Sequence, residues 1–253
     1  MKTRELTFNE QNYIDEKSVL DKETTCNGCP HDKWHKDRFG CNCEQKGQVG
    51  RFCVLRYLKH TYGLLSRIPM QYYNTRYLTP ELTGKKSFDR LKSLQNNIDK
   101  FVENGDNLFI VSESRACGKT SWACRLGLNY ITRCCWPKKE HQLVYYIDCN
   151  QFITFMNLTM YKDPIKTEML DAVENADLVI WDNLGEDVKS CSIGKMLLSA
   201  YVSKRVIYKK SNIFCMKKND LKETVSPDMG ELFNKSEHIF INPANINTDE
   251  DVF

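Results

Sequence analysis

Three adjacent residues, Gly118, Lys119 and Thr120, have the types and the order needed to bind phosphate. They match the end of the phosphate-loop pattern G-x-x-x-x-G-K-[ST], although Glu113 stands where the pattern has its first glycine. In such a loop backbone amides surround the phosphates, the lysine reaches the β- and γ-phosphates, and the Thr120 hydroxyl binds Mg²⁺. We therefore expect ATP to contact the loop residues Glu113, Ser114, Arg115, Ala116, Cys117, Gly118, Lys119, Thr120 and Ser121.

A carboxylate suited to bind magnesium follows later in the chain. Residues 177–182 form a mostly apolar segment that ends in Asp182, which is the pattern of a Walker B strand. We expect Asp182 to hold Mg²⁺ through water, opposite Thr120. The alternative is a buried strand that merely ends in a capping aspartate. The presence of the phosphate loop favours the metal-binding interpretation.

Short apolar segments alternate with helical patterns over most of the chain. Strands are predicted over residues 108–111, 143–147, 177–181, 212–216 and 238–242. Helices are predicted over 87–104, from the phosphate loop to 133, over 164–175 and over 190–209. This alternation indicates an α/β fold, in which a parallel sheet lies between helices on both faces.

A cysteine cluster near the N-terminus is the second candidate site, since five of the twelve cysteines lie there. The candidate ligands of a tetrahedral Zn²⁺ ion are Cys26, Cys29, Cys41, Cys43 and Cys53, with His31 and His35 as substitutes. The first two cysteines have the spacing of a metal knuckle, and the choice among the other three stays open. The alternative is a reduced cluster without metal. An amphipathic helix predicted over 52–65 would complete a small helical zinc module.

Length and composition restrict the class of protein. A chain of 253 residues can form one large and one small domain, and we place the boundary between 1–75 and 76–253. The formal charge of only +3 gives no global basic field. No apolar run approaches membrane-spanning length, and the polar N-terminus lacks a signal-peptide core. We therefore expect a cytoplasmic protein without membrane contact.

The chain resembles the DnaC/DnaI-type replicative helicase loaders, and in particular those encoded by bacteriophages. The resemblance rests on Ile68 and Pro69, the strand and loop over 107–120, the segment 178–185 and the strand over 212–216. It implies an AAA+ P-loop domain that binds ATP and Mg²⁺ and self-associates around single-stranded DNA. It also implies that the N-terminal module binds a hexameric helicase in the cytoplasm of a bacterial host cell.

The chain departs from this family at the positions that serve hydrolysis. Asn183 stands where the family has a second acid that orients the attacking water. Lys217, with Asn219 nearby, stands at the sensor position. Lys235 replaces the arginine finger, and no arginine follows Arg205 in the chain. Because lysine keeps the charge of arginine but not its forked geometry, we expect ATP binding with slow hydrolysis.

Two groups of side chains are candidates for contact with DNA. The segment 152–166 mixes aromatic and basic residues suited to stacking on single strands, namely Phe155, Tyr161, Lys162 and Lys166. For this segment we slightly favour an ordinary amphipathic helix and loop. A second group could line a phosphate-contacting surface: Lys204, Arg205, Lys209 and Lys210.

Two other functions fit the same residues. An IstB-type transposition helper ATPase shares the AAA+ core and acts on duplex DNA with a transposase, but no cysteine knuckle is expected ahead of that core. An ATP-gated adaptor or inhibitor of a helicase would bind nucleotide with little turnover, which suits the residues at 113, 183 and 235.

Overall fold

The structure, a computed structural model, describes residues 61–73, 75, 77–113, 117–135, 141–158, 163–185, 192–218 and 227–241. The chain divides into two compact units, Met1–Leu64 and Leu65–Phe253. Of the first unit, residues 61–64 are described, and they are helical, as predicted. The candidate zinc ligands between Cys26 and Cys53 lie outside the described residues. The zinc site and the domain boundary near residue 76 therefore stay predictions.

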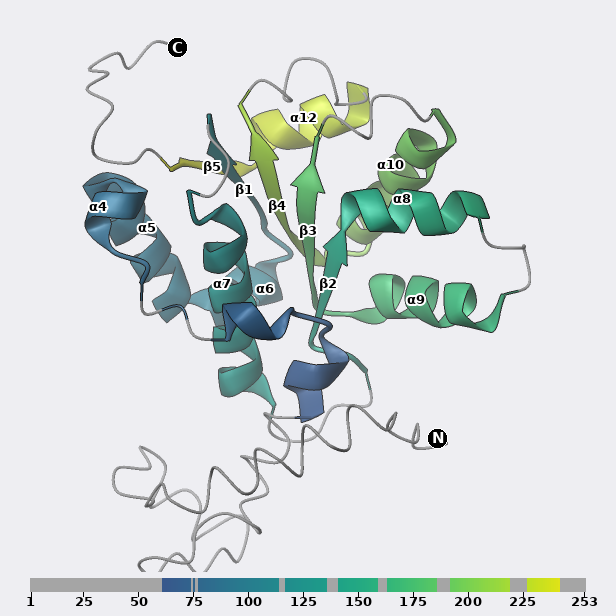
Figure 1. Cartoon of the computed structure of the whole chain (residues 1–253), viewed down its shortest axis with the longest axis horizontal. Helices are drawn as coiled ribbons and strands as arrows, with labels where there is room; N and C mark the ends of the chain where they lie inside the picture. Colours follow the sequence, from purple (N-terminus) through teal and green to yellow (C-terminus); the bar gives the residue numbers. More distant parts are fainter. Residues whose placement is uncertain are drawn as a thin grey trace, which may run out of the picture. The chain divides into compact units, whose positions relative to one another are not determined.

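The second unit is built on a sheet whose five described strands all run parallel. Along the chain the strands are β1 (Asn107–Ser112), β2 (Val144–Asp148), β3 (Leu178–Leu184), β4 (Ser211–Lys217) and β5 (Glu237–Phe240). Across the sheet they follow the order β2-β3-β4-β1-β5 (Figure 1). The prediction of a parallel sheet is confirmed, and each of the five predicted strands overlaps an observed one.

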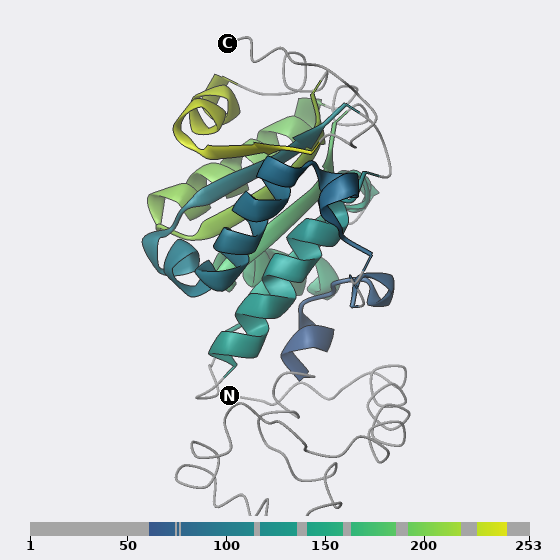
Figure 2. The ribbon, with the colours of Figure 1, turned by 90° about the vertical axis from the view of Figure 1, so that its left-hand side faces the viewer.

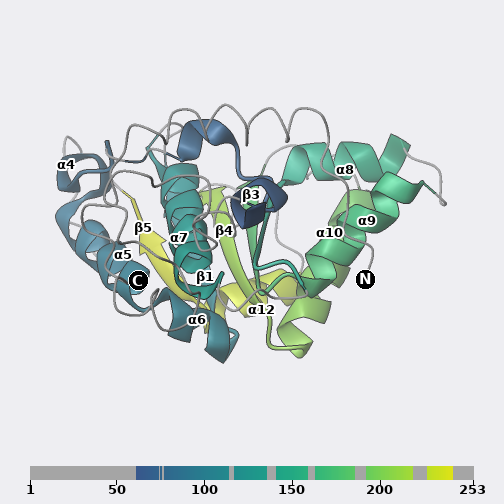
Figure 3. The ribbon, with the colours of Figure 1, turned by 90° about the horizontal axis from the view of Figure 1, so that it is seen from below.

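Helices cover both faces of this sheet (Figure 3). One face carries α5 (Lys85–Asn96), α6 (Ile98–Asn104) and α7 (Lys119–Cys134), and Figure 2 shows α7 lying along the strands. The opposite face carries α8 (Cys149–Leu158), α9 (Pro164–Asn175), α10 (Ser192–Ile207) and α12 (Pro227–Lys235). Within the described ranges, no helix is both long enough and apolar enough to cross a membrane.

The segment before these helices contains the short helices η2 (Met70–Tyr72) and α4 (Pro80–Thr83). Its first residues cover the outer edge of β2, where the backbone amide of Tyr146 donates a hydrogen bond to Ser66 O at 2.7 Å. The Gln142 side chain donates another to Leu65 O, and the Ile68 side chain is buried. This lead-in segment is therefore part of the packed second unit.

The helix predicted over 87–104 is in fact two helices, α5 and α6, which meet at Asn97. Asn97 has φ −124° and ψ 24°, and its side-chain amide donates to Ser93 O at 3.0 Å. Asparagine side chains compete for backbone groups in this way and so favour helix ends over helix interiors. The prediction of one continuous helix is therefore wrong.

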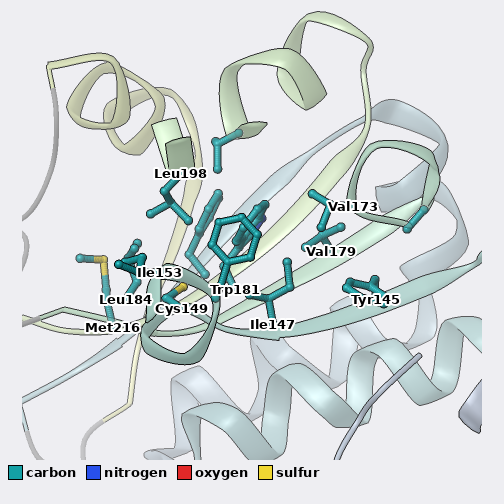
Figure 4. Close-up of a cluster of buried hydrophobic side chains, with 14 of the residues drawn as sticks. Tyr145, Ile147, Cys149, Ile153, Val173, Val179, Trp181, Leu184, Leu198 and Met216 are labelled. Carbon is teal, nitrogen blue, oxygen red and sulfur yellow. The ribbon is translucent and has the colours of Figure 1, made fainter. Parts of the chain in front are cut away.

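A large apolar core lies between the sheet and the helices α8, α9 and α10 (Figure 4). Trp181 of β3 lies within it and stacks on Phe214 of β4, with ring centroids 6.4 Å apart. The indole N–H of Trp181 donates to Asn212 Oδ1 at 3.0 Å, so the polar atom of this buried ring is satisfied. This packing fixes β3 and β4 just before the ends that carry the candidate site.

Arg205, which we expected on a phosphate-contacting surface, is buried with 1% of its surface exposed. Its guanidinium donates to Val173 O at 2.5 Å, Ala176 O at 2.9 Å, Ser211 O at 2.7 Å and Asn212 Oδ1 at 2.8 Å. Burial lowers the pKa of Arg205 to about 9. The prediction is wrong because Arg205 joins the end of α9 to the start of β4 inside the unit.

Replacing Arg205 with lysine is expected to lower the free energy of unfolding by about 3 kcal/mol or more. Lysine has no planar fork and leaves several of these buried acceptors unpaired. Urea unfolding of the full chain measures the change. Lys204→Ala is the matched control, because this neighbouring ammonium is exposed and pairs with Glu174 at 2.6 Å on the surface. An Arg205→Lys chain as stable as the parent would contradict the structural role.

Candidate nucleotide-binding site

The candidate phosphate loop lies between β1 and α7, at the carboxyl end of the sheet. Gly118 immediately precedes α7 and has φ 91°, in the left-handed region. A Cβ at this position would also lie 3.1 Å from Leu78 Cδ2, so conformation and space both favour glycine. The N-terminus of α7 is the positive end of the helix dipole and therefore suits phosphate. Residues 114–116 of the loop lie outside the described part of the chain.

The Lys119 ammonium is held against the end of β1. Its Nζ lies 2.7 Å from Ser112 Oγ and 3.4 Å from Cys117 Sγ. The Cys117 thiol in turn donates to Ser112 Oγ at 2.6 Å. Ser112 is buried and was not singled out from the sequence, where its only signal is its place directly before the loop. The structure therefore adds Ser112 to the candidate site.

Asp182 is the buried carboxylate of the site, with 3% of its surface exposed. The Thr120 hydroxyl donates to its Oδ1 at 2.8 Å and to its Oδ2 at 3.0 Å, and Tyr146 Oη donates to Oδ2 at 2.7 Å. Burial raises the pKa of Asp182, and the hydrogen bonds from Tyr146 and Thr120 oppose this rise. Burial and the Asp182 charge raise the pKa of Tyr146, so that its phenol stays a donor. The structure thus brings Thr120 and Asp182 together and adds Tyr146 to them.

The donor atoms at this point fit the metal that the sequence predicts. A hydroxyl and a carboxylate are oxygen donors of the kind that Mg²⁺ prefers. Mg²⁺ is usually bound by one or two protein ligands together with substrate phosphates and water, so a larger cluster is not needed. Among the described residues no three His, Cys, Asp or Glu side chains gather as a metal site. Thr120 and Asp182 therefore remain the candidate ligands.

Asn183 follows Asp182 in a left-handed conformation, with φ 54°, which asparagine tolerates better than most residues. Its side-chain amide donates to Asp148 Oδ2 at 2.6 Å. Asp148 is the last residue of β2 and lies in register with Asp182 of β3. Its other oxygen accepts the backbone amides of Asn150 and Gln151, each at 3.0 Å, and so caps the N-terminus of α8. No local sequence pattern predicts this contact between β2 and β3.

A cleft of about 680 Å³ opens over these residues, a volume typical of small-molecule sites. One side is formed by Asp182 and by the loop and helix residues from Cys117 to Ser121. The cleft is also lined by Tyr72, Tyr77, Leu78 and Leu82, which come from the segment before α5. Tyr77 Oη and Ser121 Oγ lie 2.6 Å apart and join this segment to α7. Apolar and aromatic side chains facing a phosphate loop suit a ligand that has both a base and phosphates.

Comparison with known proteins identifies the fold. No protein-family model and no curated protein matches the chain. Among solved structures, the DnaC helicase loader matches over 69% of this chain and 100% of its own length, with 18% identity and a TM-score of 0.55. DnaA from Aquifex aeolicus bound to AMPPCP matches over 70% of this chain and 53% of its own length, with 15% identity and a TM-score of 0.54.

The replication initiator DnaA bound to AMPPCP and single-stranded DNA also matches, over 70% of this chain and 51% of its own length, with 14% identity and a TM-score of 0.53. The chain therefore spans about half the length of the DnaA structures. The second unit has the AAA+ fold. The predicted fold class is confirmed, and the predicted resemblance to helicase loaders is confirmed as a likeness of fold.

The side chains expected to assist hydrolysis lie in different parts of the AAA+ domain. Lys217, at the end of β4, lines the cleft. Lys235 is exposed at the end of α12, where it pairs with Glu231 of the same helix at 2.5 Å. Glu113 pairs with Lys218 at 3.3 Å. Neither Glu113 nor Lys235 is among the described residues that line the cleft.

Part of the first DNA candidate group lies on α8 of the AAA+ domain. Phe155 is half-buried against the apolar core, and Lys166 Nζ donates to Met156 O at 3.3 Å. The interpretation of this segment as a helix is confirmed for residues 152–158. Tyr161 and Lys162, like the sensor candidate Asn219, lie outside the described residues. Contact with DNA stays a prediction.

The second DNA candidate group of the AAA+ domain does not form one free basic surface. Lys204 pairs with Glu174 at 2.6 Å, and Lys210 pairs with Asp177 at 3.2 Å. With Arg205 buried, Lys209 remains as an exposed lysine of this group.

Proposed function

We propose that the chain is an ATP-dependent loader that places a hexameric replicative helicase on single-stranded DNA during DNA replication. The observation that carries the proposal is the convergence of Lys119, Thr120 and Asp182 on one cleft, which is the arrangement needed for ATP with Mg²⁺. The fold that holds this cleft is shared with a DnaC helicase loader. The structures of DnaA with AMPPCP and with single-stranded DNA support both ligands.

Helicase binding and ATP binding are assigned to different parts of the chain. The first unit, Met1–Leu64, contains the candidate zinc ligands and binds the helicase. The second unit, Leu65–Phe253, binds ATP and Mg²⁺, contacts single-stranded DNA and associates with further copies of itself. The site of action is the cytoplasm of a bacterial host cell.

The geometry of the cleft supports a separate role for each side chain. The amides after Gly118 bind phosphate, and Lys119 turns from Ser112 toward the β- and γ-phosphates. Thr120 and Asp182 would hold Mg²⁺, and the ion would supply positive charge to neutralise developing charge on the phosphates. Tyr146 keeps the Asp182 carboxylate in place by its hydrogen bond. Tyr72 and Tyr77 offer rings beside the base.

An ATP-gated adaptor or inhibitor of the helicase is the second candidate function. It is favoured by Asn183, which cannot accept a proton from water, and by Lys235, which lacks the fork of arginine. Both candidates require the helicase as a partner, whereas an IstB-type helper would require a transposase.

Co-purification of the full chain with the replicative helicase of its host tests the proposal. We expect a stable complex of the two proteins, and its absence at micromolar concentrations would overturn both helicase-based functions. ATP hydrolysis measured with and without single-stranded DNA then separates the loader from the adaptor. The loader shows turnover that responds to DNA, and the adaptor shows none.

The freshly purified chain is expected to contain about one zinc ion, bound by four of Cys26, Cys29, Cys41, Cys43 and Cys53. Structural zinc contributes directly to the folding free energy of small modules, so Cys29→Ser should lose both the metal and the fold of the N-terminal module. Elemental analysis of chelator-free protein measures the metal. Cys134→Ser is the control, because this cysteine belongs to α7 in the second unit. Protein without zinc would contradict the prediction.

A further inference from the structure

Asn183 has no carboxylate, but its side chain is hydrogen-bonded to the carboxylate of Asp148. The Asn183 amide donates to Asp148 Oδ2 at 2.6 Å, across the parallel pair of β2 and β3. Asp148 is therefore placed beside the position from which an acid would orient the attacking water. Since Asp148 caps α8 through its other oxygen, its carboxylate has a fixed orientation.

Asp148 faces the same side of the sheet as the rest of the site. Side chains alternate along a strand, so Tyr146 and Asp148 of β2 point to one face. Tyr146 on that face donates to Asp182 Oδ2 at 2.7 Å.

Asp148 also opens onto space that the candidate metal ligands share. A hollow of about 880 Å³ is lined by Asp148 and Asn183 together with Thr120 and Asp182. Because Asp148 and Asn183 both line this hollow, a water molecule bound between them would meet the Asp148 carboxylate and the carbonyl oxygen of the Asn183 amide. An amide oxygen accepts a hydrogen bond but does not take up a proton, whereas a carboxylate does both.

We propose that Asp148 is the catalytic carboxylate of this chain and that Asn183 is its positioning residue. The helicase-loader family has an acid at the position of Asn183, whereas here the acid, Asp148, lies on β2 and the amide, Asn183, lies on β3. The attacking water gives a proton to the Asp148 carboxylate, and the oxygen of the water forms a bond to the γ-phosphorus of ATP. The bond from the γ-phosphorus to the bridging oxygen breaks, and ADP leaves with the electron pair. This inference rests on the proposed ATP-binding function and adds the residue that activates water.

Asp148→Asn is the decisive variant, because asparagine caps a helix about as well as aspartate but takes up no proton. Its oxygen can keep the cap on α8, and the Asn183 amide can flip so that its own oxygen accepts a hydrogen bond from the new amide. We expect kcat for ATP hydrolysis to fall by at least about 100-fold, the usual contribution of a general base. Affinity for a fluorescent ATP analogue should change by less than about threefold and the melting temperature should stay the same, because no phosphate or core contact is lost. Asp163→Asn is the matched control. Asp163 caps α9 through the amides of Ile165 and Lys166 and should leave kcat unchanged.

The double variant Asp148→Asn with Asn183→Asp returns the acid to β3 and keeps one carboxylate and one amide in the pair. We expect it to recover kcat to within about tenfold of the parent, because aspartate also tolerates the left-handed conformation at this position. A merely structural role for Asp148 predicts no such recovery.

Three results would overturn the inference. The first is an unchanged kcat in Asp148→Asn, and the second is a folded, ATP-binding double variant without recovery. The third is a parent chain that binds ATP but turns it over no faster than Lys119→Ala. Each of these leaves ATP binding intact, so it is distinguishable from a failure to bind ATP or the helicase.

Discussion

Lys119→Ala is expected to weaken ATP binding by about 100-fold or more. The lysine ammonium makes charge-assisted hydrogen bonds to the β- and γ-phosphates, and the loss of two such bonds at about 1.5 kcal/mol each gives that factor. The fold should survive, because the Cys117 thiol still bonds Ser112 when the ammonium is absent. Titration with a fluorescent ATP analogue measures the affinity, and thermal unfolding checks the fold.

Lys218→Ala is the matched control for this variant. Lys218 follows β4 near the site, but its ammonium pairs with Glu113 at 3.3 Å and does not line the cleft. Binding of ATP should therefore stay close to that of the parent chain. Helicase binding without nucleotide should survive Lys119→Ala as well. Its loss would contradict the assignment of helicase binding to the first unit, Met1–Leu64.

Lys235→Arg is expected to raise the rate of ATP hydrolysis by at least about tenfold. An arginine finger contributes about 10³–10⁵ in rate, and lysine supplies its charge but not its forked pair of hydrogen bonds. The substitution costs the fold little, because Lys235 is exposed and pairs with Glu231 on its own helix. Steady-state hydrolysis in the presence of single-stranded DNA measures the effect.

If Lys235 acts on the ATP site of a neighbouring copy, hydrolysis requires association of the copies, so the rate of ATP hydrolysis per chain rises with protein concentration. The gain from Lys235→Arg should follow the same rise. Lys86→Arg, on the exposed surface of α5, is the control for a general effect of arginine. An equal gain in Lys86→Arg, or a gain that does not depend on protein concentration, would contradict the assignment of Lys235 to the arginine-finger position.

The strands and the phosphate-binding segment were predictable from the sequence because each is specified locally. The runs at 108–111 and 213–216 are apolar on both faces, as expected for strands covered by helices on two sides. Gly118, Lys119 and Thr120 are contiguous, and their pattern does not depend on the rest of the chain. The break at Asn97 was missed because a helical pattern continues on both sides of it.

The side chains that complete the site were not predictable, because they come together only through pairing of distant strands. Tyr146 reaches Asp182 because β2 and β3 pair in one register, and a slip of one residue would turn it to the other face. The same register places Asp148 beside Asn183. Arg205 was misjudged for a related reason, since its buried acceptors come from α9 and β4 and no local pattern announces them.

The outer edge of β2 is occupied by the chain itself, since the Tyr146 amide is bonded to Ser66 O. A bare edge strand offers unpaired amides and carbonyls on which a strand of another molecule can add. A second copy could extend this sheet at β2 only by displacing the lead-in segment, including the buried side chain of Ile68. The edge is thereby protected against the strand stacking that leads to fibrils. Copies that meet on this side must do so through side-chain surfaces.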